Sequence, residues 1–355
     1  MARHARPPVH VTQEQIAKAL GLSQFTVSHA LRGTGKVAPE TTALILATAQ
    51  RLGYRINVAA RATATGRTGT IALLRNSDPR TWWFPLDLFH GLETGVERQH
   101  LRLITARMPY TSLEDEAFIP RILQELVADG VVVHCPMHPP EHLVELLQRY
   151  RIPAIWINTR LETDTLRPDD AGLARMIVRH LLRLGHRRFI YIRPVWNAHW
   201  SEAVRRAAVQ DELVLAGCPP LQVIDRSSTG LPAEAAAIVA VHAALVGPQR
   251  PTAAIGYGHG EAQEFRAAAA LAGLRIPEEL SIAVIGGDQQ TNFNDPLATT
   301  AGEIDWGVMG ERAVALLCRK IAEPSMALPA EEVAPRMQVG RSCAPPAADQ
   351  RLTAG

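Results

Sequence analysis

The chain has 355 residues, of which 47% are hydrophobic and 20% charged, and this length predicts two or three domains and excludes a small fold that needs disulfides. No apolar stretch approaches the roughly 20 residues that span a bilayer. The basic N-terminus runs into polar sequence instead of the apolar core of a secretory signal. We therefore expect a cytoplasmic protein without membrane contact, and its four scattered cysteines, with no CxxC pair, predict reduced thiols.

The charge is distributed unevenly along the chain. Residues 1–67 contain nine Lys or Arg and two Glu, a charge of +7, whereas the remainder carries −5, so that the whole chain has a formal charge of +2. A basic head on a mildly acidic body predicts a polyanionic partner for the head.

The basic head contains three predicted helices. Thr12 is placed to cap a helix that ends at Leu20, and Gln15 occupies the capping-box position. Ser23 is placed to cap a second helix after the turn at Gly21, and a third runs from near Pro39 to Gly53. Three short helices with a four-residue turn predict a helix-turn-helix.

The second helix has an apolar face and a polar face. Its polar face can reach base edges in the major groove, and the expected base-reading residues are Gln24, Ser28, His29 and Arg32. Phe25, on the same side, either touches a thymine methyl group or folds back onto the domain. The residues expected to hold phosphates are Thr12, Ser23, Thr26 and Lys36. A helical hairpin with a merely solvated face is the alternative, and the +7 charge disfavours it.

Residues 59–69 are small, polar and basic, which predicts a hinge or linker. Beyond them, short β-rich runs alternate with helical patterns, and the runs lie at 70–74, 101–105, 130–133, 152–157, 188–192, 252–257 and 281–286. This alternation predicts an α/β fold with parallel sheets and right-handed crossovers. About ten such units are more than a single sheet usually contains, so we expect two doubly wound subdomains, with ligands at the carboxyl ends of their strands.

The ordered series of segments resembles the lactose-repressor (LacI/GalR) family of transcription regulators. The resemblance begins in HVTQEQIAKALGLSQFTVSHALRGTGKVAPET and AQRLGYRIN, and continues through ADGVVV, HLLRLGHRRFIYI and LAGLRIPEELSIAVIGGD to VGRSCAPP. It implies a homodimer that binds double-stranded operator DNA through a headpiece, and a hinge helix that enters the minor groove. It also implies a core like that of periplasmic sugar-binding proteins, with a small effector between its subdomains.

Domain limits follow from the motifs and the resemblance together. We expect a headpiece at 9–57, a hinge at 58–68, an effector-binding core at 69–343 and a tail at 344–355. The first subdomain is expected at about 69–163 plus 302–325, and the second at about 164–301 plus 326–343.

Two DNA-facing positions depart from the family pattern. His29 stands where relatives usually have arginine, and it is shorter and lacks the guanidinium fork. Thr63 stands where a hinge leucine usually wedges between base pairs, so wedge-driven kinking is not expected here. Asn57 and Arg61 are retained as expected hinge contacts, and Arg61 can enter the minor groove.

Some of the effector-binding positions implied by the resemblance keep the residue that is usual in the family, and others do not. Arg205 and Asp288 match family contacts, whereas Asn158 and His259 replace residues that supply carboxylates, so a hexose effector is not assumed. Aromatic residues on loops are expected to stack on the ligand, with a core or interface role as the alternative; they are Trp82, Trp83, Phe84 and Trp196.

No metal site, cofactor or catalytic set is expected. Prolines interrupt the stretch that contains His134, Cys135, His138 and His142, and no GxSxG, HExxH or P-loop sequence is present. We interpret the chain as an effector-controlled DNA-binding regulator, and favour a repressor over an activator. The alternatives are a regulator that no longer responds to an effector, a sugar-binding protein of transport, and an enzyme acting on a small metabolite.

Overall fold

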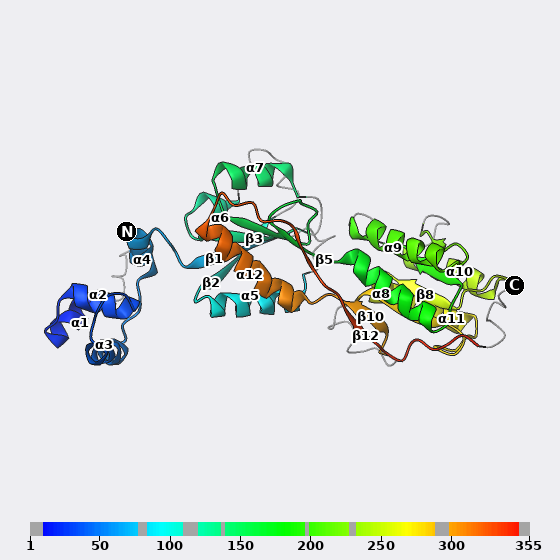
Figure 1. The fold of residues 1–355 in the computed structure, drawn as a ribbon, viewed down its shortest axis with the longest axis horizontal. Coiled ribbons are helices and arrows are strands. Elements are labelled where there is room, and N and C mark those ends of the chain that lie inside the picture. Colours follow the sequence, from blue (N-terminus) through cyan, green and yellow to red (C-terminus); the bar gives the residue numbers. More distant parts are fainter. Residues whose placement is uncertain are drawn as a thin grey trace, which may run out of the picture. The chain divides into compact units, whose positions relative to one another are not determined.

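The computed structural model describes residues 10–76, 84–108, 120–135, 139–195, 199–226, 232–287 and 298–347. The chain divides into two compact units, Met1–Thr68 and Gly69–Gly355 (Figure 1). Each unit is described by itself below.

The first unit contains the three expected helices, α1 Gln13–Leu20, α2 Gln24–Arg32 and α3 Pro39–Leu52. Thr12 and Gln15 form the predicted capping box, because the Thr12 hydroxyl accepts from the Gln15 amide at 3.2 Å and the Gln15 side chain accepts from the Thr12 amide at 2.8 Å. Ser23 caps α2 by accepting from the Thr26 amide at 3.1 Å. Caps of this kind each stabilise a helix by about 1 kcal/mol. The buried residues of the three helices form one small core, made of Ile16, Ala17, Val27, Ala30, Ile45 and Ala49.

A fourth helix, α4, spans Val58–Thr65 where composition alone predicts a hinge or linker. Asn57 caps it, with its side-chain oxygen accepting from the Ala60 amide at 3.1 Å, and it ends at Gly66 with φ 68°. The alanines between these caps favour helix, although the segment has little apolar surface to bury. The hinge helix that the family resemblance implies is therefore formed in this structure.

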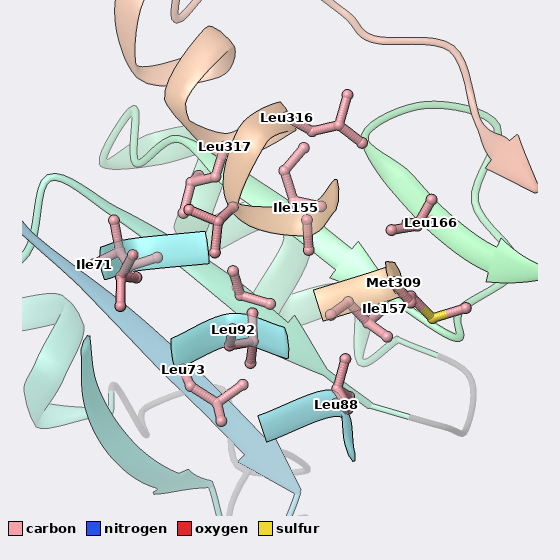
Figure 2. Close-up of a cluster of buried hydrophobic side chains, with 14 of the residues drawn as sticks. Ile71, Leu73, Leu88, Leu92, Ile155, Ile157, Leu166, Met309, Leu316 and Leu317 are labelled. Carbon is pink, nitrogen blue, oxygen red and sulfur yellow. The ribbon is translucent and has the colours of Figure 1, made fainter. Parts of the chain in front are cut away.

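The first sheet of the second unit has six parallel strands in the order β11-β5-β4-β3-β1-β2. Its strands are β1 Thr70–Asn76, β2 Arg102–Met108, β3 Gly130–His134, β4 Ala154–Ile157, β5 Thr165–Pro168 and β11 Glu331–Val333. The helices of this half are α5 Leu86–Arg98, α6 Arg121–Gln124, α7 Glu141–Arg149 and α12 Trp306–Ala322. Figure 2 shows Leu88 and Leu92 of α5 beside Ile71 and Leu73 of β1, with α12 completing the same core.

The second sheet has the order β12-β10-β9-β8-β6-β7, and only β12 is antiparallel. Its strands are β6 Phe189–Ile192, β7 Gln222–Ile224, β8 Ala253–Gly256, β9 Ser281–Gly287, β10 Thr300–Glu303 and β12 Arg336–Gln338. The helices are α8 Asp170–Arg183, α9 Ser201–Leu215, α10 Ala233–Val246 and α11 His259–Leu271. Separate cores on the two faces, one under α8 and α9 and one under α10 and α11, confirm the expected doubly wound arrangement.

The chain passes between the two sheets three times. It crosses from β5 to α8, from β10 to α12 and from β11 to β12. Strand pairing therefore puts 165–168 and 331–333 in the first sheet and 302–303 in the second, which differs from the expected subdomain limits. These short strands carry no apolar run that marks them in the sequence, and their sheet is decided by their partners. Among the described residues, no helix combines the length and apolar character needed to cross a membrane.

Candidate functional site

The first unit has a concave surface lined by both polar and apolar residues. The hollow measures about 1070 Å³ and lies between the first residues of the described chain, α2 and the segment that leads into α4. Five of the residues expected to touch DNA line it, namely Thr12, Gln24, Ser28, Arg32 and Asn57. The structure thus brings Gln24, Ser28 and Arg32 of α2 to the same surface as Asn57, which begins the hinge.

Phe25 and His29 form a pair on the neighbouring face of α2. Phe25 is 72% exposed, so it does not fold back into the headpiece core. Its ring lies against the His29 ring, with centroids 4.2 Å apart. His29 also reaches the turn after α2, where its Nδ1 lies 3.1 Å from the Thr34 carbonyl oxygen. Whether Phe25 touches a thymine methyl group stays a prediction.

The remaining DNA-facing residues have local roles that the sequence only partly indicates. The Arg32 Nε donates to the Ser28 carbonyl at 3.1 Å, which fixes the stem of the side chain beside α2. The Thr26 and Ser23 hydroxyls lie 2.8 Å apart at the start of α2, and Lys36 is exposed in the turn that follows it. On α4, Thr63 is exposed, while the side chain of Arg61 lies outside the described residues.

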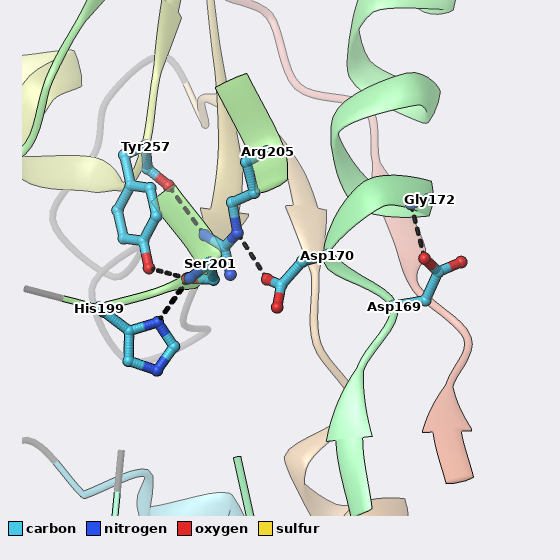
Figure 3. A network of polar contacts seen from close by, with 7 residues as sticks. All are labelled: Asp169, Asp170, Gly172, His199, Ser201, Arg205 and Tyr257. Carbon is cyan, nitrogen blue, oxygen red and sulfur yellow. Dashed lines mark hydrogen bonds and ion pairs between the residues drawn. The ribbon is translucent and has the colours of Figure 1, made fainter. Parts of the chain in front are cut away.

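Arg205 is the centre of a second polar site, in the half of the core built on the second sheet. Arg205 lies on α9 and its guanidinium is buried. Its Nε donates to the Asp170 carboxylate at 2.7 Å (Figure 3). The guanidinium also lies 4.3 Å from the centre of the Tyr257 ring, and Nη1 reaches the Tyr257 carbonyl at 3.4 Å. Gly286 makes room for it, since a Cβ there would lie 2.5 Å from Nη1.

The ion pair is strongly shielded from water. Burial raises the pKa of Asp170, and the Arg205 charge opposes that rise only in part. Burial also disfavours the charged form of Arg205, but the neighbouring Tyr257 and Asp170 outweigh it and keep its pKa above the usual range. Among the described residues, the second Asp170 oxygen has no hydrogen-bond partner. The site therefore keeps an arginine charged beside a carboxylate oxygen that is buried and has no hydrogen-bond partner among the described residues.

A chain of hydroxyls lies beside this pair. The Ser201 amide donates to His199 Nδ1 at 3.2 Å, so that nitrogen is an acceptor. The Ser201 hydroxyl, 2.6 Å from the same nitrogen, then donates to it and accepts from the Tyr257 hydroxyl at 2.6 Å. Figure 3 shows these groups converging near the start of α9. If the Ser201 hydroxyl donates to His199, the Tyr257 hydroxyl donates to Ser201 and its oxygen can still accept a hydrogen bond from a ligand.

The carboxyl edge of the first sheet carries a different set of side chains. His134 ends β3 and is buried, with the Phe84 ring edge-on at 5.0 Å and Arg75 of β1 5.9 Å from the Phe84 centroid. Burial lowers the pKa of His134 to about 4, and the Arg75 charge adds to this. Asn158 follows β4 in the left-handed region, with φ 57°, which asparagine tolerates better than most residues.

A very short connection joins the carboxyl end of β5, in the first sheet, to α8, which packs on the second sheet. β5 ends at Pro168, and only Asp169 separates it from Asp170, which pairs with Arg205 at the second sheet. Ligands of such sheets bind at the carboxyl ends of strands. The polar sets of both sheets therefore border the same crossing of the chain.

Four of the eight predicted effector residues lie in the described part of the chain, and four lie outside it. Arg205, Asn158, Phe84 and His259 lie at carboxyl edges, and His259 begins α11 directly after β8. Trp82, Trp83, Trp196 and Asp288 lie outside the described residues.

Sequence reasoning missed Asp170, Ser201 and Tyr257. The signal that could have identified Asp170 is the acidic pair Asp169-Asp170 at the start of a helix, directly after a strand. Nothing comparable marks Ser201. Where the chain is described, no three His, Cys, Asp or Glu side chains converge as they would around a metal ion.

Comparisons with known proteins agree with this architecture. Residues 178–343 match the family model of the periplasmic binding protein-like domain. The chain is 27% identical over 348 residues to the HTH-type transcriptional repressor PurR of Pectobacterium carotovorum subsp. carotovorum, covering 94% of this chain and 97% of that protein. It is also 27% identical to the PurR repressor of Photorhabdus laumondii, covering 93% and 96%.

Solved structures show the same fold. The lac repressor dimer bound to operator and an anti-inducer has a TM-score of 0.72 at 16% identity, covering 95% of this chain and 100% of that one. A cellobiose complex of the transcriptional regulator CelR has a TM-score of 0.62 at 18% identity, covering 94% and 100%. The similarity extends over headpiece and core together.

Proposed function

We propose that the chain is a member of the lactose-repressor (LacI/GalR) family of transcription regulators, and that it is a sequence-specific DNA-binding repressor whose operator affinity is controlled by a small effector. One observation carries the proposal: a basic headpiece with an exposed polar helix face is joined to a core with a buried arginine site at the carboxyl edges of its sheets. The chain acts in the cytoplasm, performs no catalysis and needs no cofactor.

The headpiece supplies the DNA contacts. Its charge of +7 provides the sequence-independent attraction to phosphates. Gln24, Ser28 and Arg32 of α2 read base edges in the major groove, and α4 lies in the minor groove with Arg61 toward its negative potential. The protein acts as a homodimer, so its operator is pseudopalindromic.

The core supplies the control. An effector that binds more tightly to one arrangement of the two subdomains shifts the population toward it. The two halves of the core are connected by three crossings of the chain. Binding of an effector near these crossings changes the angle between the two halves. Closure changes the order and spacing of the two α4 helices in the dimer, and with them the affinity for the operator.

The effector is a small polar molecule that Arg205 can bind through paired hydrogen bonds. Asn158 and His259 leave fewer carboxylates than relatives use, so the ligand has fewer hydroxyl donors to satisfy than a hexose. One observation favours a second candidate, a regulator that no longer responds to an effector: Asp170 already occupies one edge of the Arg205 guanidinium.

The test is binding-site selection with the purified protein on random duplex DNA at a stated salt concentration. We expect enrichment of one two-fold-symmetric sequence, and release or strengthening of that complex by at least one small metabolite. Sequence-independent, salt-sensitive binding alone would contradict the proposal, because electrostatic attraction gives that result without base readout.

Two charge-matched variants sharpen the test. Arg32→Ala removes a side chain at the hollow, and Arg51→Ala removes the same charge from the last turn of α3, outside it. We expect Arg32→Ala to reduce specific affinity by about 1–3 kcal/mol and to relax one base position, and Arg51→Ala to keep the sequence preference. Equal losses in both variants would show that Arg32 contributes only charge.

A further inference from the structure

The turn that follows α2 selects one tautomer of the neutral His29 ring. Its Nδ1 lies 3.1 Å from the Thr34 carbonyl oxygen and 3.3 Å from the Thr34 hydroxyl. A carbonyl oxygen only accepts, so Nδ1 carries the hydrogen. In the neutral imidazole the other nitrogen, Nε2, is then a bare acceptor.

Two neighbours keep the ring in this pose. Phe25, one turn earlier on α2, covers it at 4.2 Å between centroids. Gly35 lies on the other side with φ 85°, and a Cβ at this position would stand 2.6 Å from His29 Nδ1. The turn therefore accommodates the ring only because residue 35 has no side chain. The Thr34 amide also donates to the His29 carbonyl at 3.0 Å, so the turn is tied to the helix by its backbone.

We propose that His29 reads the operator as a hydrogen-bond acceptor, and that the Thr34 carbonyl sets this role. An acceptor on α2 pairs with the amino groups that cytosine N4 and adenine N6 present in the major groove. An arginine at the same position would instead donate to guanine O6 and N7. His29 thereby selects the opposite kind of base edge from the one that arginine selects.

This inference rests on the proposed function, because it concerns how the same helix reads DNA. Its test compares the base preferences of four full-length proteins in parallel selections: wild type, His29→Arg, His29→Glu and His29→Ala. The arginine variant only donates, the glutamate variant only accepts and the alanine variant does neither. The base position whose preference changes between wild type and His29→Ala is the one that His29 contacts.

At that position we expect wild type and His29→Glu to share a preference for cytosine or adenine, and His29→Arg to prefer guanine. A guanine preference in wild type would overturn the inference, because it requires a donor. An unchanged preference at every position in His29→Ala would overturn it too, since the ring would then reach no base. Failure of all four proteins to enrich a symmetric sequence would refute the proposed function, and this inference with it.

Two glycine variants separate the ring's pose from backbone strain. Gly35→Ala places a Cβ against Nδ1, whereas Gly33→Ala, at φ 66°, meets nothing within 4 Å. Both substitutions strain a left-handed residue in the same turn. We expect Gly35→Ala to lose at least about threefold of the preference at the His29 base, roughly 0.7 kcal/mol, and Gly33→Ala to keep it. Equal effects would show that the contact with residue 35 does not set the ring.

Discussion

Arg205 and Asp170 are 5% and 3% exposed, so neither charge has water as an alternative partner. Removing one member of a buried pair strands the other and destabilises a protein by about 3–5 kcal/mol. The arginine that the sequence marks as an effector contact therefore also stabilises the core. A substitution at Arg205 can therefore impair regulation in two ways, by removing the effector contact or by destabilising the core.

We predict that Arg205→Ala abolishes the effector response, leaves operator affinity nearly intact and lowers the free energy of unfolding by about 3 kcal/mol. Urea denaturation measures the free energy of unfolding. Fluorescence anisotropy with labelled operator measures the operator affinity and its change when effector is added. Operator binding that disappears while the fold is retained would refute the assignment.

The double variant Arg205→Ala/Asp170→Ala is the matched control. It removes both charges, so its stability loss is expected to be smaller than the sum of the two single losses. Its effector response is still absent, because the guanidinium is still missing. Additive losses would show that the pair contributes no coupling energy.

The residues of this site were predictable to different degrees. Arg205 is marked by its place in the resemblance, whereas Asp170, 35 positions earlier, meets it only because α8 packs on α9. That packing depends on the two helices sharing one face of the second sheet, which no local pattern specifies. The contact between the Ser201 and Tyr257 hydroxyls depends in the same way on packing between elements.

At the scale of elements, α4 is a helix with exposed caps and little apolar surface. The family resemblance places Thr63 where a leucine is usual. A threonine is too short to insert between stacked base pairs, so we expect α4 to contact the minor groove without an inserted side chain.

We predict that Thr63→Leu raises operator affinity on the order of tenfold, about 1.4 kcal/mol, and increases the bend of the bound DNA. The gain should be largest when the central step is a flexible pyrimidine–purine step. Gel-shift assays with circularly permuted fragments measure affinity and bend together. Thr63→Val is the control, since valine has the shape of threonine and the same short reach. A gain of equal size in both would show that apolar character, not insertion, is responsible.

The sequence indicates the long elements well and the short ones poorly. Seven β-rich runs from 70–74 to 281–286 correspond to strands of the two sheets. The run at 59–69 looks like a linker because its alanines bury nothing, and only the caps at Asn57 and Gly66 define α4. β5 and β11 lack the apolar runs that mark β4, β6 and β8, which are equally short, and they are fixed by pairing with each other, so the hydrophobic pattern cannot identify them.

At the scale of the whole core, two buried histidines link stability to pH. Burial lowers the pKa of both His134 and His186 to about 4; the Arg75 charge adds to the effect at His134, and a bond to the Ala344 carbonyl partly opposes it at His186. The unfolded chain binds these protons near the ordinary value of 6.5. Between the two values the unfolded state holds more protons, so stability is present above that window and is lost as the pH falls through it.

We predict a loss of about 2 kcal/mol per histidine between about pH 7 and about pH 5. Urea midpoints measured across this range test the prediction. His134→Leu should remove roughly half of the slope, because it removes one of the two titrating histidines. Among the described residues His134 Nε2 has no hydrogen-bond partner, so the substitution costs no bond at that atom. An unchanged slope in this variant would show that His134 is not one of the groups responsible.

The path of the chain through the two sheets also governs when each region can fold during synthesis. The headpiece helices are complete at Leu52, early in translation, whereas the first sheet needs α12 for its core and β11 for its edge. The second sheet is closed only by β12, which ends at Gln338. Until α12 has been synthesised, the side of α5 that packs on it is uncovered, so we expect the nascent first half of the core to expose apolar surface for longer than a domain whose packing partners are consecutive in the sequence.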